Sequence, residues 1–233
     1  MNAPQLDDLR RALPPGAKPS AYSLALNFLP FLHLLAGAVL VWAVDGAPAR
    51  VAAALAWIYL LPPLASRVAM LLFGVAQGEG LDQNARAFKV WWFLVQWQVL
   101  FNRFGFLEEL LRMVPGLYAL WLNLWGARVS PLVYWGPGAA VVDRPSVRIA
   151  AGAVIGTRAV LAGHLAVKGA HGEFLVTLAP VEIGERALIG AYAGIAPGCR
   201  VAAGEEVPAA AFLRPHTVWS EGRRVRPQRP RTP

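Results

Sequence analysis

Residues 183–213 divide into steps of six, which read IGERAL, IGAYAG, IAPGCR, VAAGEE and VPAAAF before a final L. Each step begins with a branched aliphatic residue and continues with glycine, alanine or proline. The fifth position of most steps is also small. A repeat of this length is typical of a solenoid, in which every step buries one aliphatic side chain and turns the chain at a small residue. The spacing therefore predicts a solenoid in the C-terminal half of the chain.

The same register occurs earlier in the chain, and nine step-opening positions share it. They are Ile149, Ile155, Leu161, Ile183, Ile189, Ile195, Val201, Val207 and Leu213. Three steps close one triangular turn, so residues three steps apart should stack in columns around an aliphatic interior. Alternation with period two would indicate a flat sheet and heptads a coiled coil, and neither fits. Cys199, the only cysteine, stands at a fifth position, where we expect it to be buried as a small packing residue.

The repeat resembles that of the hexapeptide-repeat acyltransferases, whose fold is a left-handed parallel β-helix. The layout is also similar to membrane-anchored members of that superfamily, including the repeat regions that end some peptide synthetases. In those proteins hydrophobic helices lead into a segment like WLNLWGARV, here residues 121–129. The resemblance implies an all-β left-handed β-helix over residues 129–216 and transfer of an acyl group from a thioester such as acetyl-coenzyme A. It also implies a homotrimer with sites shared between neighbouring chains.

The repeat is interrupted between Leu161 and Ile183, which are 22 residues apart, four more than a multiple of six. A segment should therefore leave the solenoid at this point. In many members of the family a histidine at the edge of such a break is the general base, and His164 occupies the matching place. Histidine suits this role because its neutral imidazole accepts a proton from an attacking hydroxyl or amine near neutral pH. His171, in the same segment, is the alternative base.

Weaker signals point to further site residues. The backbone N–H groups of Gly190 or Ala191, one turn above, are candidate donors to the oxyanion of the reaction. Lys168 is a candidate contact for the phosphates of the acyl donor, although a solvated loop lysine is an equal alternative. A zinc site with His164 and His171 would need a third histidine in a spacing that this chain lacks, so no metal is predicted.

Two apolar runs dominate the N-terminal half and follow a short segment, residues 1–20. Residues 21–44 carry no formal charge and are long enough to cross a hydrocarbon core of about 30 Å. The second run, residues 51–74, contains Pro62, Pro63 and Arg67. The prolines should kink this run, and Arg67 must face protein, water or lipid headgroups. Together the two runs predict a transmembrane helical hairpin over residues 21–74.

His33 lies inside the first run. Such a histidine serves as a proton relay or lines an acyl-chain tunnel in some membrane proteins. More often it forms a hydrogen bond to a neighbouring helix, which is the interpretation favoured here.

Basic residues flank the hairpin on both sides, whereas only Arg50 lies in its loop. The positive-inside rule therefore places both ends and the C-terminal domain in the cytoplasm, with the hairpin in a bacterial inner membrane. Residues 82–126 are rich in tryptophan with polar residues interspersed, which predicts amphipathic helices that lie in the interface or re-enter one leaflet. A third and a fourth crossing are the alternative.

The chain carries 22 Lys and Arg against 14 Asp and Glu, a formal net charge of +8. This excess indicates an anionic partner, acidic lipid headgroups more than a phosphorylated substrate. No nucleic-acid-binding motif is present, so nucleic acid is not an expected partner. The segment 217–233 is rich in arginine and proline and is predicted to be a disordered basic tail.

The sequence therefore predicts a membrane-anchored O- or N-acyltransferase with histidine as its general base. The alternative is a non-catalytic β-helix scaffold or assembly protein on the membrane. Glu205, at a position that is normally small, favours the scaffold slightly because it makes the repeat irregular.

Overall fold

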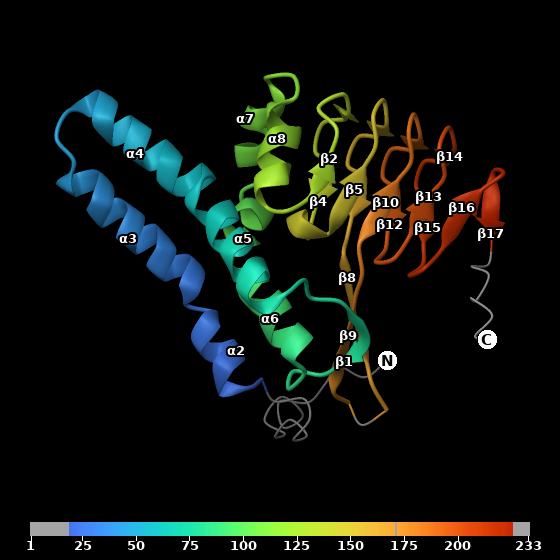
Figure 1. The fold of residues 1–233 in the computed structure, drawn as a ribbon, viewed down its shortest axis with the longest axis horizontal. Helices are drawn as coiled ribbons and strands as arrows, with labels where there is room; N and C mark the ends of the chain where they lie inside the picture. The colour runs from blue at the N-terminus through green and yellow to red at the C-terminus, as the bar shows by residue number, and fades with distance from the viewer. Residues whose placement is uncertain (1–18, 171, 226–233) are drawn as a thin grey trace, which may run out of the picture.

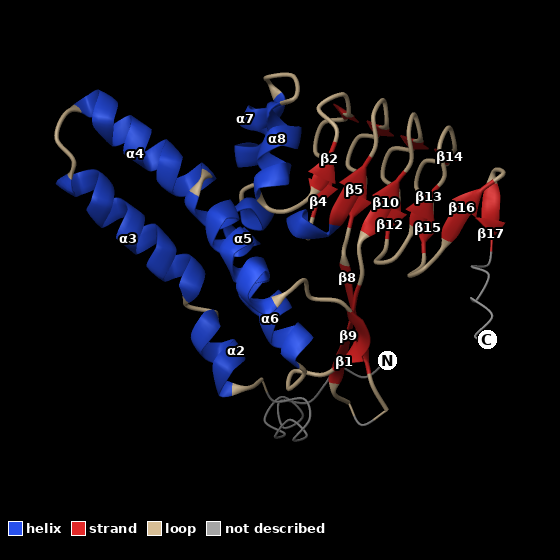
Figure 2. Cartoon of the chain, viewed as in Figure 1, coloured by secondary structure: helices blue, strands red, loops and turns tan. Residues whose placement is uncertain are grey.

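A computed structural model describes residues 19–170 and 172–225 (Figure 1). Helices form the N-terminal half and short strands the C-terminal half, as Figure 2 shows. His171, the alternative base, lies outside the described residues, as does nearly all of the expected N-terminal segment.

Two long apolar stretches fold back on one another at the start of the helical region. They consist of α2 (Ala21–Leu26) with α3 (Leu29–Ala43), and of α4 (Ala47–Tyr59) with α5 (Leu61–Phe73). Each stretch is long and apolar enough to cross a membrane. The predicted kink is confirmed, because the second stretch breaks at Leu60, just before the two prolines.

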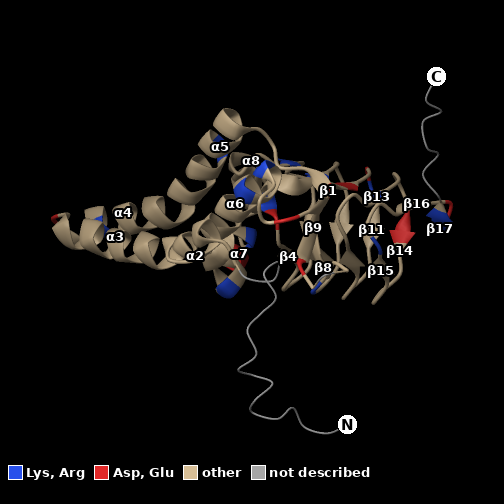
Figure 3. Ribbon diagram, turned by 90° about the horizontal axis from the view of Figure 1, so that it is seen from below, with Lys and Arg blue, Asp and Glu red and all other residues tan. Residues whose placement is uncertain are grey.

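The outer surface of this hairpin is apolar. Charged residues are sparse along α3 and α4 (Figure 3). Large side chains that point away from the rest of the protein include Phe28, Phe31, Leu35, Val39 and Trp42, the last of which is 81% exposed. A contiguous exposed apolar surface of this kind marks a site of contact with a membrane or another protein.

His33 differs from its expected state. Its ring is buried and stacks on Trp57, with centroids 5.5 Å apart. Neither ring nitrogen has a hydrogen-bond partner among the described residues, so the predicted side-chain bond to a neighbouring helix is wrong. The contact between the helices is made by the backbone carbonyl of His33, which accepts a hydrogen bond from Trp57 Nε1 at 3.0 Å.

Three further helices lie between the hairpin and the strands. They are α6 (Arg86–Arg103), α7 (Phe106–Arg112) and α8 (Leu117–Leu124). Their tryptophans and polar side chains predict helices at a membrane interface, but many of these groups face the protein. The buried ones include Trp91, Gln96, Gln98, Glu108, Trp121 and Trp125. Trp91, Gln98 and Glu108 form hydrogen bonds within the fold, and Trp121 and Trp125 form aromatic contacts.

The strands wind into four turns of a three-sided solenoid. The first turn consists of β2 (Arg128–Val129), β3 (Tyr134–Trp135) and β4 (Ala140–Val141), and the second of β5 (Val147–Ile149), β6 (Val154–Ile155) and β7 (Val160–Leu161). The third turn consists of β10 (Val181–Ile183), β11 (Leu188–Ile189) and β12 (Gly194–Ile195), and the fourth of β13 (Arg200–Val201), β14 (Glu206–Val207) and β15 (Phe212–Leu213). Successive turns pair in parallel on each of the three sides.

The nine predicted aliphatic positions form columns, as expected. On one side, for example, Ile155, Ile189 and Val207 are register partners in consecutive turns. All nine side chains are at most 3% exposed. Cys199 is fully buried, and its thiol donates to the carbonyl of Arg214 at 3.0 Å, so its predicted packing role is confirmed.

Each end of the solenoid is covered in part. At the first turn, Trp121 and Trp125 of the helical region join the same hydrophobic core as the aliphatic columns. At the last turn, β16 (Val218–Ser220) pairs with β13, and β17 (Arg223–Val225) returns antiparallel to it. The other two sides end on β14 and β15, which are the last strands of their sheets.

The prediction of a disordered tail is wrong for the part of it that the structure describes. Val218 and Trp219 continue the repeat, three steps after Arg200 and Val201, so the chain adds another strand. Glu205 holds the turn that follows, because its carboxylate accepts hydrogen bonds from the backbone N–H groups of Glu221 and Gly222 at 2.8 and 2.9 Å. The irregular residue thus has a structural role. Residues 226–233 lie outside the described residues.

The interruption of the repeat is a β-hairpin, in agreement with the predicted excursion. It consists of β8 (His164–Lys168) and β9 (Phe174–Leu178) and projects from the solenoid (Figure 1). The strand β1 (Gly78–Leu81), which follows the helical hairpin, pairs with β9 and completes a three-stranded antiparallel sheet. This long-range pairing was not predicted.

Candidate active site

Asp143 and His164 meet at one edge of the solenoid. At this edge the chain leaves the side formed by β4, β7, β12 and β15 and enters the next turn. We call it the interrupted edge, and it consists of residues 142–146, 162–180, 196–199 and 214–217. Val141 and Leu161 are register partners in the first and second turns. Asp143 lies two residues after Val141, and Gly163 lies two residues after Leu161. The two are side by side, and the N–H of Gly163 donates to Asp143 Oδ2 at 2.8 Å. His164 Nδ1 lies 2.7 Å from the same oxygen.

The Asp143 carboxylate fixes the proton on one nitrogen of the imidazole. Its Oδ1 accepts a hydrogen bond from Trp91 Nε1 at 3.0 Å. An ionised carboxylate only accepts hydrogen bonds, so His164 Nδ1 must be the donor in their contact. In the neutral ring, Nε2 then carries the free lone pair, and it has no hydrogen-bond partner among the described residues. This is the arrangement that a general base requires.

Burial and charge act in opposite directions on the His164 imidazole. Its side chain is 27% exposed, and the Trp91 ring lies against it with centroids 4.8 Å apart. This burial is the largest single effect and lowers the pKa of His164. The hydrogen bond and the negative charge of Asp143 together outweigh it, so that the pKa is raised above its usual value.

Helix α6 holds the interrupted edge in place. Trp91 and Gln98 are two helical turns apart and therefore lie on the same face of α6. Trp91 binds the side chain of Asp143, and Gln98 Oε1 accepts a hydrogen bond from the backbone N–H of Arg144 at 2.7 Å. Arg144 begins a short 3₁₀ turn, η2 (Arg144–Ser146), which leads into β5.

The Arg144 guanidinium is buried in a polar network between η2, α6 and α7. Its side chain is 1% exposed and lies 2.6 Å from Glu108 Oε1. It also donates to Asn102 Oδ1 at 2.9 Å. Glu108 accepts a second hydrogen bond from the Tyr118 hydroxyl at 3.0 Å. A buried charge is tolerated only with such partners, so this network fixes η2 and hence the backbone next to Asp143.

The structure does not bring Lys168, Gly190 or Ala191 to His164. Lys168 is exposed at the far end of β8, opposite Phe174. Gly190 and Ala191 form part of the turn between β11 and β12, at a different edge of the solenoid. The N–H of Gly190 already donates to the carbonyl of Val207 at 2.8 Å, and the assignment of an oxyanion donor at Gly190 or Ala191 stays a prediction.

Asp143 and Trp91 were missed by the sequence analysis. A signal for Asp143 exists, because Val141 and Ile149 are eight residues apart and the register therefore slips by two. The slip lies one turn before the large interruption and at the same edge. No comparable signal identifies Trp91, whose contact with Asp143 joins residues 52 positions apart.

No protein-family model and no curated protein matches this chain. Among solved structures, a hexapeptide-repeat containing acetyltransferase from Vibrio cholerae is 14% identical, with a TM-score of 0.33 over 55% of this chain and 90% of that chain. Soybean serine acetyltransferase is 15% identical, with a TM-score of 0.28 over 90% of this chain and 100% of that chain. Serine acetyltransferase from Neisseria gonorrhoeae is 15% identical, with a TM-score of 0.21 over 93% of this chain and 80% of that chain. These likenesses are low, and the fold and site described above rest on the chain's own strand pairing and contacts.

Proposed function

We propose that this protein is a membrane-anchored acyltransferase with a left-handed β-helix of the hexapeptide-repeat type. It moves an acyl group, most simply acetyl, from a coenzyme A or carrier thioester to a hydroxyl or amine. The observation that carries the proposal is the Asp143–His164 pair at the interrupted edge. A carboxylate on one ring nitrogen and a free lone pair on the other is the chemistry that proton abstraction needs.

The reaction follows from this geometry. His164 Nε2 takes the proton of the acceptor hydroxyl or amine as its oxygen or nitrogen attacks the thioester carbonyl carbon. The tetrahedral intermediate then collapses with cleavage of the carbon–sulfur bond, and the imidazolium returns the proton to the leaving thiolate. Asp143 stabilises the positive charge on the ring between these two steps.

The anchoring part of the proposal rests on the exposed apolar surface of the helical hairpin. Both apolar stretches are long enough to cross a membrane, and most of their side chains are not buried by the protein. We place the hairpin in a bacterial inner membrane with the solenoid in the cytoplasm, in accordance with the distribution of basic residues. The trimer that the family resemblance implies remains part of the proposal.

Replacement of His164 tests the function. Purified wild-type protein and His164→Gln are incubated with acetyl-coenzyme A and bacterial lipid or glycan extracts, and mass spectrometry identifies acetylated products. We expect the rate to fall by a factor of about 10²–10⁴ in the variant, the usual contribution of a general base. His216→Gln is a matched control, because His216 lies at the same edge in the fourth turn and contacts Glu79 instead.

The test also separates the enzyme from the scaffold. If no acetylated product forms with the wild-type protein and His164→Gln leaves cellular function unchanged, the scaffold is correct and the proposed chemistry is wrong. Equal losses in both histidine variants would also contradict the assigned role of His164.

A further inference from the structure

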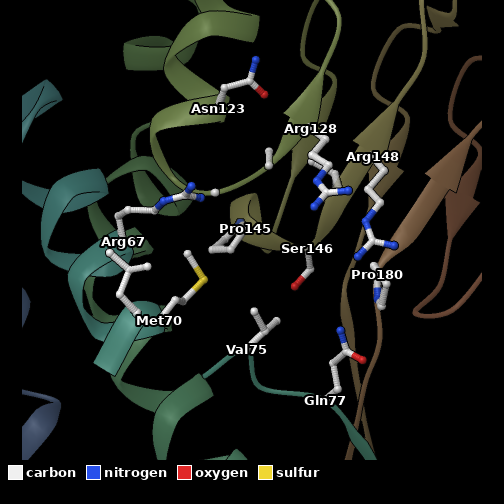
Figure 4. Close-up of a pocket in the computed structure, with 14 residues that line it drawn as sticks. Arg67, Met70, Val75, Gln77, Asn123, Arg128, Pro145, Ser146, Arg148 and Pro180 are labelled. Carbon is white, nitrogen blue, oxygen red and sulfur yellow. The ribbon is translucent and has the colours of Figure 1, made fainter. Parts of the chain in front are cut away.

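A cavity of about 360 Å³ lies between α5 and the first two turns of the solenoid (Figure 4). Three arginines from three separate elements line it, Arg67 of α5, Arg128 of β2 and Arg148 of β5. We propose that this cavity binds the phosphate ester headgroup of an amphiphile. The proposal rests on the membrane anchoring proposed above, since it places the cavity at the junction of membrane and solenoid.

The described part of the chain does not balance the charge around the cavity. Fourteen of the described residues line it, and none of them is Asp or Glu. Arg148 pairs with Glu182 at 2.7 Å, but Glu182 is shared with Arg200 at 3.1 Å. Among the described residues, no carboxylate oxygen lies within 4.0 Å of the guanidinium of Arg67 or Arg128.

Two of these arginines are held close together by the strand register. Arg128 and Arg148 are partners in the parallel pair β2 and β5 and point to the same face. Neighbouring strands lie about 4.8 Å apart, and like charges at partner positions repel. A bound anion removes this repulsion. Phosphate fits best because its oxygens match the planar, forked donors of arginine.

The apolar wall of the cavity indicates that the anion belongs to an amphiphile. Leu71, one helical turn after Arg67, lines the same cavity and is 76% exposed. Leu64, one turn before Arg67, is 50% exposed. One face of α5 therefore presents an arginine between exposed leucines. An amphiphile contacts these leucines with its chains while its headgroup contacts the arginines, which a soluble anion cannot do.

The cavity adjoins the candidate active site. Ser146 lines it and also lines a smaller cavity that reaches Trp91 and Asp143. Ser146 also packs closely against Gly163, where an added Cβ would lie 2.6 Å from the Ser146 Cβ. An amphiphile held by the arginines is thus next to the residues that position His164.

Binding by the full-length protein in dodecyl maltoside tests the proposal. The probe is dioctanoyl phosphatidic acid, titrated by isothermal calorimetry, with dioctanoylglycerol as a probe that has the same chains and no phosphate. We expect saturable binding that weakens about tenfold in Arg67→Gln and in Arg128→Gln, because each loses one charge-assisted contact. Arg67→Lys should lose less, since it keeps the charge. Thermal unfolding of each variant verifies that it is folded.

Arg186→Gln is the control for general surface charge, because Arg186 is exposed at a turn away from the cavity, with a side chain that is 79% exposed. An equal loss of affinity in Arg186→Gln overturns the proposal, as does equal affinity for dioctanoylglycerol. Inorganic phosphate is the soluble probe, and if it binds as tightly as the phosphatidic acid, the site recognises a soluble anion and the assignment to an amphiphile is wrong.

The proposed function and this inference fail separately. His164→Gln should bind dioctanoyl phosphatidic acid as the wild type does, because His164 does not line the cavity. Binding that persists where no acyl transfer is detected supports the cavity and contradicts the enzyme. Acyl transfer by wild-type protein that shows no binding contradicts the cavity alone.

Discussion

The regular edges of the solenoid and its interrupted edge are built from different interactions. At the two regular edges most buried turn residues are alanines, and Ala153, Ala159, Ala187 and Ala193 are each fully buried. At the interrupted edge the first turn buries Asp143 and Arg144 instead, at 2% and 1% exposure. The regular edges need only the repeat itself, whereas the interrupted edge depends on partners from α6 and α7. Polar chemistry is therefore concentrated where the repeat fails and a second region supplies the contacts.

The largest effect is expected from breaking the buried network at the interrupted edge. Glu108→Ala leaves the buried Arg144 guanidinium without its carboxylate partner. We expect a loss of about 3–5 kcal/mol in the free energy of unfolding, measured by denaturant titration with tryptophan fluorescence. Glu182→Ala is the control on a regular side, because its ion pairs with Arg148 and Arg200 are exposed. That variant should lose at most about 1 kcal/mol. Similar losses in the two variants would remove the distinction between the edges.

A cavity in an aliphatic column should cost slightly less. Ile189 is fully buried between its register partners Ile155 and Val207. Ile189→Ala removes aliphatic carbons that the neighbouring turns cannot replace, so we expect a loss of about 3 kcal/mol by the same titration. The graded variant Ile189→Val should lose about 1 kcal/mol. If Ile189→Ala proves neutral, the columns are not the source of the solenoid's stability.

The contrast between the edges also explains what the sequence could predict. The columns were predictable because each step depends on residues close in the chain, and one period describes all of them. Asp143 gave a weaker signal, the slip of two residues after Val141. A slip shows that an edge is irregular but does not show which side chain becomes buried there.

The contacts of α6 were not predictable in the same way. Polar residues on an amphipathic helix can face water, headgroups or a buried partner, and the spacing is the same in all three cases. Gln98 was assigned to the interface for that reason, and in the structure it binds the backbone of Arg144. The pairing of β1 with β9 joins segments almost 100 residues apart, and four residues of β1 carry no periodic pattern.

A smaller effect, measured on activity, should follow from Asp143→Asn. The amide keeps the size of the carboxylate but removes the charge that raises the pKa of His164. Burial then acts alone and lowers this pKa. Because the base works when deprotonated, the rising limb of the pH–rate profile should move to lower pH. The maximal rate should fall by a factor of about 10–100, since the imidazolium loses its stabilising partner.

The control for this variant is Asp45→Asn, in the exposed loop between α3 and α4. It should change neither the rate nor the profile. A lower rate in Asp143→Asn with an unmoved limb would mean that Asp143 only supports the fold of the interrupted edge.

The smallest effect is expected at a regular edge, from the backbone alone. Ala210 occupies the left-handed region with φ of 57°, a conformation that costs alanine more than glycine, and its side chain is exposed. Ala210→Gly should therefore stabilise the solenoid by up to about 1 kcal/mol in the free energy of unfolding. Ala209→Gly, at the preceding residue of the same turn, should destabilise it by about 0.5–1 kcal/mol, because φ there is not positive. The two substitutions remove the same methyl group one position apart, so a difference in sign isolates the backbone conformation from side-chain packing. Equal effects would show that the turn adopts another conformation. The repeat would then not determine the backbone conformation at each residue of the regular edges.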